Sequence, residues 1–329
     1  MNKSSLNIQP SYTQEFNFEQ AINSDIAQLW ARREEGFIQS FDKTRLYWIK
    51  ISSAHNNKAI VIVNGRIECV WKYQELFFDL FQQGYNIYSF DHRGQGLSER
   101  LIDDSQMGYV DDFEDYTHDL HHLVQHFNLE QYKSCYLMGH SMGGNIITRY
   151  LQTFPQHPFA AIALSAPMYG VNLPWHLQLV AIPFNQLMAV LSSQPKFAPG
   201  QLPYYPKPFD GNLLSQSQVR YHWFRALYEQ KPELKIGGAS HRWVWQGLMA
   251  AQKCHLMARH IKKPLLILQA GDDKIVSNCA QLKFYNKVIK NNHDCVLKVI
   301  ENSRHEILFE KDEYRNQALD SILSFYRRY

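Results

Sequence analysis

The sequence of 329 residues has no hydrophobic run long enough to cross a bilayer, no Cys-X-X-Cys motif and no strong excess of either charge. The first absence, with a mean hydropathy of −0.40, excludes a polytopic membrane protein. The net charge of +3 is too small to indicate a nucleic-acid partner, although it is compatible with contact with anionic phospholipid. Hydrophobic residues make up 45% of the chain and aromatic residues 14%, which excludes a disordered or fibrous protein. We therefore expect a soluble globular protein.

The cysteines are odd in number and widely spaced, which predicts reduced and mostly buried thiols. They are Cys69, Cys135, Cys254, Cys279 and Cys295. The first ten residues contain one lysine but no apolar segment and no small-residue cleavage site, so they do not resemble a secretory signal. A cytoplasmic protein is expected, with peripheral contact with the inner membrane as a further option.

Strands and helices alternate along most of the chain, which is typical of a mostly parallel central sheet with helices on both faces. Apolar runs predict strands that are covered on both faces. Strands are expected at residues 45–51, 59–63, 86–90, 134–138, 160–165, 264–269 and 295–300. Helices are expected at residues 18–33, 71–83, 112–127, 145–154, 280–290 and 314–329.

The alternation stops between residues 168 and 261, where no buried strand is predicted and prolines and aromatic residues are frequent. This pattern predicts an inserted helical lid (cap) subdomain at residues 168–261 in an α/β core made of residues 19–167 and 262–329. Residues 1–18 are polar and are expected to form a flexible terminal segment.

A serine between two glycines, in the order Gly139-His140-Ser141-Met142-Gly143, follows a predicted strand and precedes a predicted helix. A hydrolase presents its nucleophile on such a sharp turn, at a strained backbone angle. A Cβ atom at Gly139 or Gly143 would collide with the neighbouring strand or helix. The context favours Ser141 as a nucleophile over the alternative of a plain tight turn.

A serine nucleophile needs a histidine to take its proton and a carboxylate to hold that histidine, and in this strand–turn–helix context the acid and then the histidine follow late strands. Asp272 and Asp273 follow one late strand, and His305 follows the last. Asp273 is preferred because it directly precedes a basic residue and an apolar pair. The alternatives are a solvated His305 and an Asp273 that caps a helix. His140 is expected to support packing and to point away from the serine hydroxyl.

The tetrahedral intermediate needs two N–H donors. The backbone N–H groups of Met142 and Arg66 are the candidates for this oxyanion hole, and Gly65 would permit close approach of the backbone or merely form a turn. Glu68 and Lys72, four residues apart, are expected to form a surface pair. The turn at residues 91–98 is expected to shape a loop without a chemical role.

Together these motifs resemble the α/β-hydrolase superfamily, and within it the monoacylglycerol lipase and lysophospholipase group, from about residue 20 onward. The resemblance rests on residues 65–68, 72–73, 91–96, 140–144, 163–168 and 305–312. It implies cleavage of the acyl ester of a lysophospholipid into a fatty acid and a glycerophosphodiester, with acyl transfer to phosphatidylglycerol as a second reaction. It implies neither a metal nor an organic cofactor. Relatives often carry His-Gly where this chain has Asn64-Gly65, a difference that bears on substrate detail.

Several alternatives stay open at this stage. On the same scaffold they are a monoacylglycerol lipase, a thioesterase and a proline-directed peptidase, and outside enzymes an idle hydrolase fold that binds a lipid or a partner. The apolar stretch at residues 173–191 either packs against the core, which is favoured, or contacts acyl chains and membrane. His241, Trp243 and Trp245 are candidates for the pocket mouth or for core packing. The sequence makes no prediction of oligomeric state.

Overall fold

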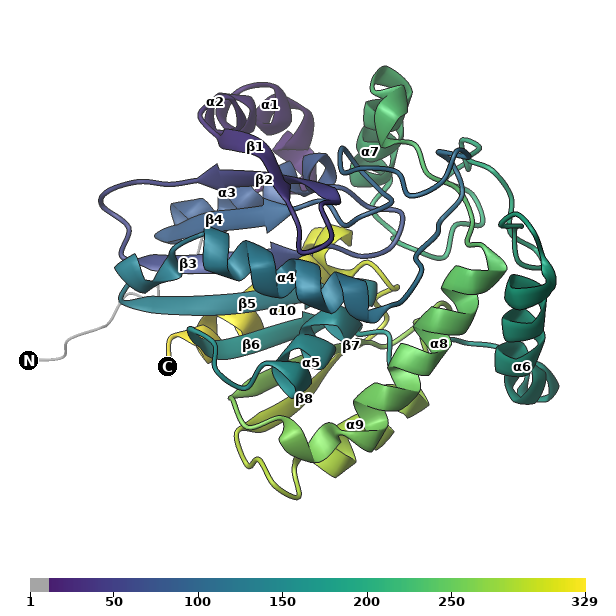
Figure 1. The fold of residues 1–329 in the computed structure, drawn as a ribbon. Helices are drawn as coiled ribbons and strands as arrows, with labels where there is room; N and C mark the ends of the chain where they lie inside the picture. The colour runs from purple at the N-terminus through teal and green to yellow at the C-terminus, as the bar shows by residue number, and fades with distance from the viewer. Residues whose placement is uncertain (1–11) are drawn as a thin grey trace, which may run out of the picture.

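The computed structural model describes residues 12–329, and its framework is an eight-stranded sheet in the order β1-β2-β4-β3-β5-β6-β7-β8 (Figure 1). The strands from β4 to β8 are parallel, and β1 and β2 are antiparallel to their neighbours. The strand bounds are β1 Glu34–Gln39, β2 Arg45–Ile51, β3 Lys58–Val63, β4 Tyr85–Phe90, β5 Ser134–His140, β6 Phe159–Ser165, β7 Leu265–Ala270 and β8 Cys295–Ile300. The predicted mostly parallel sheet is confirmed.

Helices cover both faces of the sheet, with α4 and α5 in front and α3 and α10 behind in Figure 1. Every residue of β4 and β7 is buried, as expected for strands that are covered on both faces. The bounds of the core helices are α3 Gln74–Gln82, α4 Glu114–His126, α5 Met142–Thr153, α9 Asn278–Val288 and α10 Asp312–Tyr326. All five cysteines are free, and only Cys279 among them is exposed, in agreement with the prediction.

Three α-helices lie between β6 and β7 in the chain, beyond the carboxyl ends of the parallel strands (Figure 1). They are α6 Trp175–Leu191, α7 Gln218–Gln230 and α8 His241–Leu256, and this part of the described chain contains no strand, as predicted. Helix α8 packs against both α6 and α5, so it connects the inserted segment (residues 168–261) to the core. No helix in residues 12–329 combines the length and apolar character that a membrane span requires.

The start of the described chain is held in place, so the prediction of a flexible segment is wrong for residues 12–18. The Tyr12 hydroxyl donates a hydrogen bond to Asp320 at 2.8 Å, and the Thr13 amide donates one to Asp79 at 2.9 Å. Phe18 is buried against the core. The partners lie far along the chain, which is why the polar character of this segment was misleading. Residues 1–11 of the prediction lie outside the described residues.

Two further differences from the predicted elements have local causes. The single helix expected at residues 18–33 is divided into α1 Phe18–Asn23 and α2 Asp25–Ala31, because Ser24 leaves helical geometry at φ −121° and ψ −95°. Strand β1 was not predicted, because its sequence has few apolar residues and its side chains are partly or fully exposed at the sheet edge. Neither difference affects the strands that carry the candidate site.

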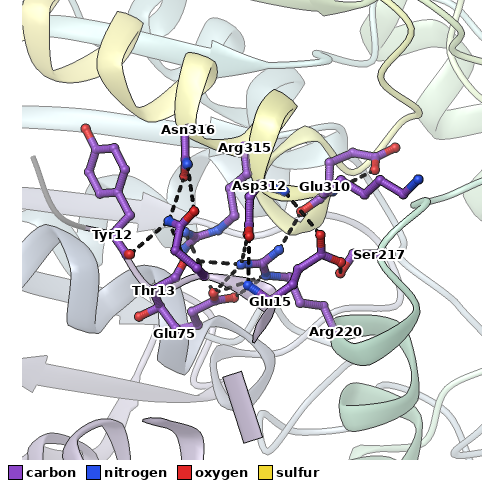
Figure 2. A network of polar contacts seen from close by, with 12 residues as sticks. Tyr12, Thr13, Glu15, Glu75, Ser217, Arg220, Glu310, Asp312, Arg315 and Asn316 are labelled. Atoms are coloured by element: carbon purple, nitrogen blue, oxygen red, sulfur yellow. Dashed lines mark hydrogen bonds and ion pairs between the residues drawn. The ribbon is translucent and has the colours of Figure 1, made fainter. Parts of the chain in front are cut away.

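A buried polar network holds α7 against the core (Figure 2). Arg220 of α7 donates to the Glu75 carboxylate at 2.8 Å, to Asp312 at 2.8 Å and to the Glu310 carbonyl at 2.8 Å. Arg315 of α10 pairs with Asp79 at 2.7 Å in the same region. Because these charges are buried and paired, moving α7 away from the core would expose or orphan them at a high cost.

Candidate active site

Ser141 occupies a strained turn between β5 and α5, with φ +52° and ψ −115°. A Cβ atom on Gly139 would lie 2.5 Å from the Ile147 side chain, and one on Gly143 would lie 2.2 Å from the Val63 carbonyl oxygen. Only glycine fits at position 143, where the contact is with backbone, whereas a Cβ atom at position 139 would require the end of the Ile147 side chain to shift. The predicted strain and both predicted collisions are confirmed, and the turn holds the serine side chain at the carboxyl edge of the sheet.

The structure brings Ser141, His305 and Asp273 into one chain of hydrogen bonds. The distance from His305 Nε2 to Ser141 Oγ is 3.0 Å, and the distance from His305 Nδ1 to Asp273 Oδ2 is 2.8 Å. With the proton on Nδ1, the ring donates to the carboxylate and accepts the serine hydroxyl. Asp272 instead pairs with Lys274 at the surface, 2.6 Å away.

The local environment keeps Asp273 ionised. Burial alone would raise the pKa of this carboxyl, but the hydrogen bond and charge of His305 outweigh burial and lower it. The amides of Ile275 and Val276 also donate to Asp273 Oδ1, at 2.8 and 3.0 Å. The carboxylate therefore can orient the imidazole and stabilise its protonated form.

The two candidate oxyanion donors lie on the turns that follow β3 and β5. Met142 is the first residue of α5, where an N–H group has no partner within the helix. In the other turn the Gly65 amide is already occupied, because it donates to Glu68 Oε2 at 2.6 Å. A Cβ atom on Gly65 would lie 2.7 Å from the same oxygen. The Arg66 amide therefore stays the candidate donor of that turn.

A buried charge cluster lies beneath this turn, and the prediction that Glu68 and Lys72 form a surface pair is wrong. Lys72 Nζ is 2.8 Å from Glu68 Oε1 and 2.7 Å from Glu306 Oε1, and all three side chains are at most 6% exposed. The Tyr73 hydroxyl donates to Glu68 at 2.6 Å. The spacing of Glu68 and Lys72 suits an exposed or a buried pair equally, and the third partner, Glu306, is far away in the sequence.

The cluster connects the candidate oxyanion turn to the histidine loop. Burial alone would raise the pKa of Glu68, but Lys72 outweighs burial and lowers it to about 2. Burial alone would lower the pKa of Lys72, and the two carboxylates raise it instead. Glu306 directly follows His305, so one ammonium group holds both loops in position.

Further polar contacts support the turn after β3. Gln95 Nε2 donates to the carbonyl oxygens of Gly65 and Glu68, each at 2.8 Å, so the turn at residues 91–98 has a structural role, as expected. The Asn64 side chain is buried and donates to the Phe90 carbonyl at 3.0 Å. The departure from His-Gly at this position therefore concerns the packing between β3 and β4.

His140 is buried beside the site. Among the described residues it forms no hydrogen bond with the Ser141 hydroxyl. Its Nδ1 donates to the Ser165 carbonyl at 3.2 Å, and its ring centroid is 4.9 Å from that of His305. Burial lowers the pKa of His140 to about 4, so the ring is neutral at physiological pH. Its role is packing, in agreement with the prediction.

A cavity of about 780 Å³ opens above Ser141 and His305, between the core and the inserted segment. This volume lies within the range of about 300–1,000 Å³ that is typical of small-molecule sites. Its walls are largely apolar and include Leu177, Val180, Phe184, Leu202, Trp243 and Leu248. Of the three aromatic candidates for the mouth, Trp243 lines this cavity, whereas His241 binds Asn185 at 2.7 Å and lines a separate small pocket.

Comparison with known proteins agrees with the fold. The family model described as "Serine aminopeptidase, S33" matches residues 54–312. Lysophospholipase L2 of Escherichia coli (strain K12) is 32% identical over 96% of this chain and 94% of its own length. A probable lysophospholipase L2 of Haemophilus influenzae is 35% identical over 82% of this chain and 83% of its own length.

Solved structures show the same fold. A soluble variant of monoglyceride lipase from Saccharomyces cerevisiae, in complex with a substrate analog, is similar with a TM-score of 0.69 and 19% identity. The match covers 90% of this chain and 94% of the other. The chain therefore belongs to the serine aminopeptidase S33 family and is an α/β-hydrolase.

Proposed function

We propose that this protein is a lysophospholipase, a carboxylic ester hydrolase that releases a fatty acid and a glycerophosphodiester. The observation that carries the proposal is the hydrogen-bonded chain of Ser141, His305 and Asp273 at the floor of an apolar cavity. Both relatives described above bear the name lysophospholipase L2, the second as a probable assignment. The reaction needs no group beyond the side chains and amides already described.

In the proposed mechanism, Ser141 Oγ attacks the ester carbonyl carbon while His305 Nε2 accepts the hydroxyl proton. The N–H groups of Arg66 and Met142 hold the oxyanion of the tetrahedral intermediate. His305 then gives its proton to the glycerol oxygen as the ester C–O bond breaks, and the acyl group remains on Ser141. Water, deprotonated by His305, attacks this acyl enzyme and releases the fatty acid. An alcohol in place of water would give acyl transfer.

Charge favours a phospholipid over a neutral lipid as the substrate. The inserted segment contains nine Lys and Arg but three Asp and Glu, so its net charge of +6 exceeds the +3 of the whole chain. This segment forms one wall of the cavity. Arg220, Arg242 and Lys253 of this segment pair with carboxylates of the core, but Lys207 and Arg225 line the cavity. Cations at the cavity wall attract an anionic phosphate and give a monoacylglycerol no comparable advantage.

We also propose that the inserted segment acts as a lid and that α6 makes peripheral contact with the membrane. Large apolar side chains of α6 are exposed, among them Leu179 at 75%, Val190 at 66% and Leu191 at 71%. Other residues of the same helix line the cavity. An exposed apolar helix in a positively charged segment can bind at the interface of an anionic bilayer. A lysophospholipid resides at the same interface.

The second candidate is a monoacylglycerol lipase, which several relatives and solved structures support by their names. An aminopeptidase, which the family description names, is less well supported. It would need a carboxylate for the substrate amine, and in the described chain the carboxylates that line the cavity, Glu68 and Glu306, both bind Lys72.

The deciding experiment compares fatty-acid release from a lysophospholipid and a monoacylglycerol that carry the same acyl chain. We expect a higher kcat/KM for the lysophospholipid, and a loss of about 10³-fold or more in kcat for Ser141→Ala. Equal or faster cleavage of the monoacylglycerol would favour the second candidate. No cleavage of either ester would favour an idle fold that binds lipid.

A further inference from the structure

Three basic side chains line the cavity without a carboxylate partner. They are Arg66 from the core, and Lys207 and Arg225 from the inserted segment. In residues 12–329 no ion pair involves any of the three, although most buried arginines of this protein have one, such as Arg220 with Glu75. The two acidic side chains of the cavity wall, Glu68 and Glu306, share the single cation Lys72, so this cluster keeps one negative charge. The Lys, Arg and Glu side chains that line the cavity therefore carry four positive and two negative charges, a net charge of +2.

The Arg66 side chain is half-buried, and its guanidinium group has few polar contacts. Its guanidinium carbon lies 4.9 Å from the ring centroid of Trp243, and its Nη1 is at the long distance of 3.5 Å from the Gly237 carbonyl. Burial lowers the pKa of Arg66 to about 10, with the Tyr116 hydroxyl acting in the opposite direction. A desolvated cation beside a reaction centre is stabilised when an anion enters the cavity.

Arg225 is in a similar position on α7. Its guanidinium lies 5.0 Å from the Tyr221 ring and 4.9 Å from the Phe224 ring, and its Nη2 donates to the Tyr221 hydroxyl at 3.2 Å. Its Nε is buried and has no hydrogen-bond partner in the structure. A buried donor without a partner is costly. The network around Arg220 holds α7, the helix that carries Arg225, against the core (Figure 2).

The two arginines flank the same part of the cavity. Tyr228, one helical turn after Arg225, donates to the carbonyl of Ile67, the residue that follows Arg66, at 3.2 Å. Tyr204 provides a second connection between the two arginines. Its ring centroid lies 6.4 Å from that of Tyr228, and its backbone packs against Gly237, whose carbonyl Arg66 approaches.

We propose that Arg66 and Arg225 form a subsite that binds the phosphodiester of the substrate headgroup while the ester lies at Ser141. This inference rests on the proposed function. In a lysophospholipid, a certain number of covalent bonds separates the ester carbonyl carbon from the phosphorus. The same number of bonds separates the Arg66 amide nitrogen from the guanidinium carbon of Arg66. A substrate whose oxyanion binds the Arg66 amide can therefore place its phosphate at the Arg66 guanidinium. Planar guanidinium groups bind phosphate oxygens in pairs.

The subsite has a kinetic signature that a structural role would not produce. The phosphate contacts exist both in the bound substrate and in the transition state, so their loss raises KM and changes kcat little. A monoacylglycerol has no phosphate and cannot use them. We expect Arg225→Met to lower the ratio of kcat/KM for lysophospholipid to kcat/KM for monoacylglycerol by roughly ten- to a hundredfold.

The test measures this ratio for the full-length wild type, Arg225→Met and the control Arg242→Met, with palmitoyl esters of glycerophosphoethanolamine and of glycerol. Arg242 is an arginine of the same segment that lies 5.9 Å from a tryptophan ring, Trp245, but it lies outside this cavity. Its substitution removes the same charge from the segment. If Arg225→Met does not fold, as judged by circular dichroism, Arg66→Met decides with the same substrates.

A ratio that falls through KM in Arg225→Met and stays unchanged in Arg242→Met supports the subsite. An unchanged ratio in Arg225→Met, or an equal fall in both variants, overturns it while the proposed lysophospholipase activity still stands. If the wild type releases no palmitate from the phospholipid, the proposed function itself fails, and the subsite fails with it.

Discussion

Lys72 is the residue whose substitution most directly tests how this site is held together. It is the cation between Glu68, which contacts the candidate oxyanion turn, and Glu306, which follows His305. Lys72→Met keeps most of the side-chain volume but removes the charge. Two buried carboxylates then remain close together without a positive partner.

The expected magnitude follows from burial. Removing one partner of a buried ion pair costs about 3–5 kcal/mol, a large fraction of the roughly 5–15 kcal/mol that stabilises a typical protein. The side chains here are 2%, 4% and 6% exposed, so solvent screens them little. The midpoint of thermal unfolding should fall by about 4–7 °C. Because both loops move, kcat should fall by about 10²-fold.

The assay is denaturant unfolding at several pH values, with Lys253→Met as the control. Lys253 also pairs with a glutamate, Glu114 at 3.0 Å, but its side chain is 41% exposed, so its loss should cost about 0–1 kcal/mol. In the wild type, Glu68 has a pKa of about 2, below its ordinary value of 4.5. Its contribution to stability is therefore present above about pH 4.5 and is lost as the pH falls toward 2.

In Lys72→Met the sign is reversed. Without the cation, burial raises the pKa of Glu68, so the folded state binds protons more readily than the unfolded state and gains stability on acidification. The difference in unfolding free energy between wild type and variant should be largest near neutral pH and should shrink toward about pH 5. A difference no larger than that of the control, or one independent of pH, would refute the reasoning.

Three other substitutions give clear expectations. Gly65→Ala should lower both activity and stability, the latter by about 1–3 kcal/mol, because the new methyl group would lie 2.7 Å from a buried carboxylate oxygen; wild-type unfolding and turnover would contradict this. Asp273→Asn should leave the fold intact and reduce kcat by about 10⁴-fold, as measured by fatty-acid release, because His305 would lose the partner that fixes its tautomer. Leu179→Asp on α6 should weaken co-sedimentation with anionic lipid vesicles more than Leu256→Asp, a change at a leucine of matched exposure, 77% against 75%, at the end of α8; equal binding by both variants would argue against the membrane contact.

The elements that carry the chemistry were predictable because their signals are local. Two glycines flank Ser141 because the sharp turn leaves little room for a Cβ atom at either position. Asp273 and His305 each follow an apolar strand at the expected place in the chain. The buried strands of the parallel sheet are continuous apolar runs. The sequence therefore predicted both the fold and the residues that the structure brings together.

The parts that were missed depend on contacts between distant segments. The pairing of Lys72 with Glu306 joins residues more than two hundred positions apart, so the spacing of Glu68 and Lys72 alone indicated a surface pair. The anchoring of Tyr12 depends in the same way on Asp320. Strand β1 has an edge position and little apolar character, so only its pairing with β2 defines it.

The most direct test of the central claim is labelling with a fluorophosphonate, followed by peptide mass analysis and assay of lysophospholipid cleavage on the same samples. We predict a single adduct on Ser141, loss of fatty-acid release in proportion to labelling, and protection by added lysophospholipid. An adduct on another residue, or full cleavage activity after complete labelling of Ser141, would contradict it.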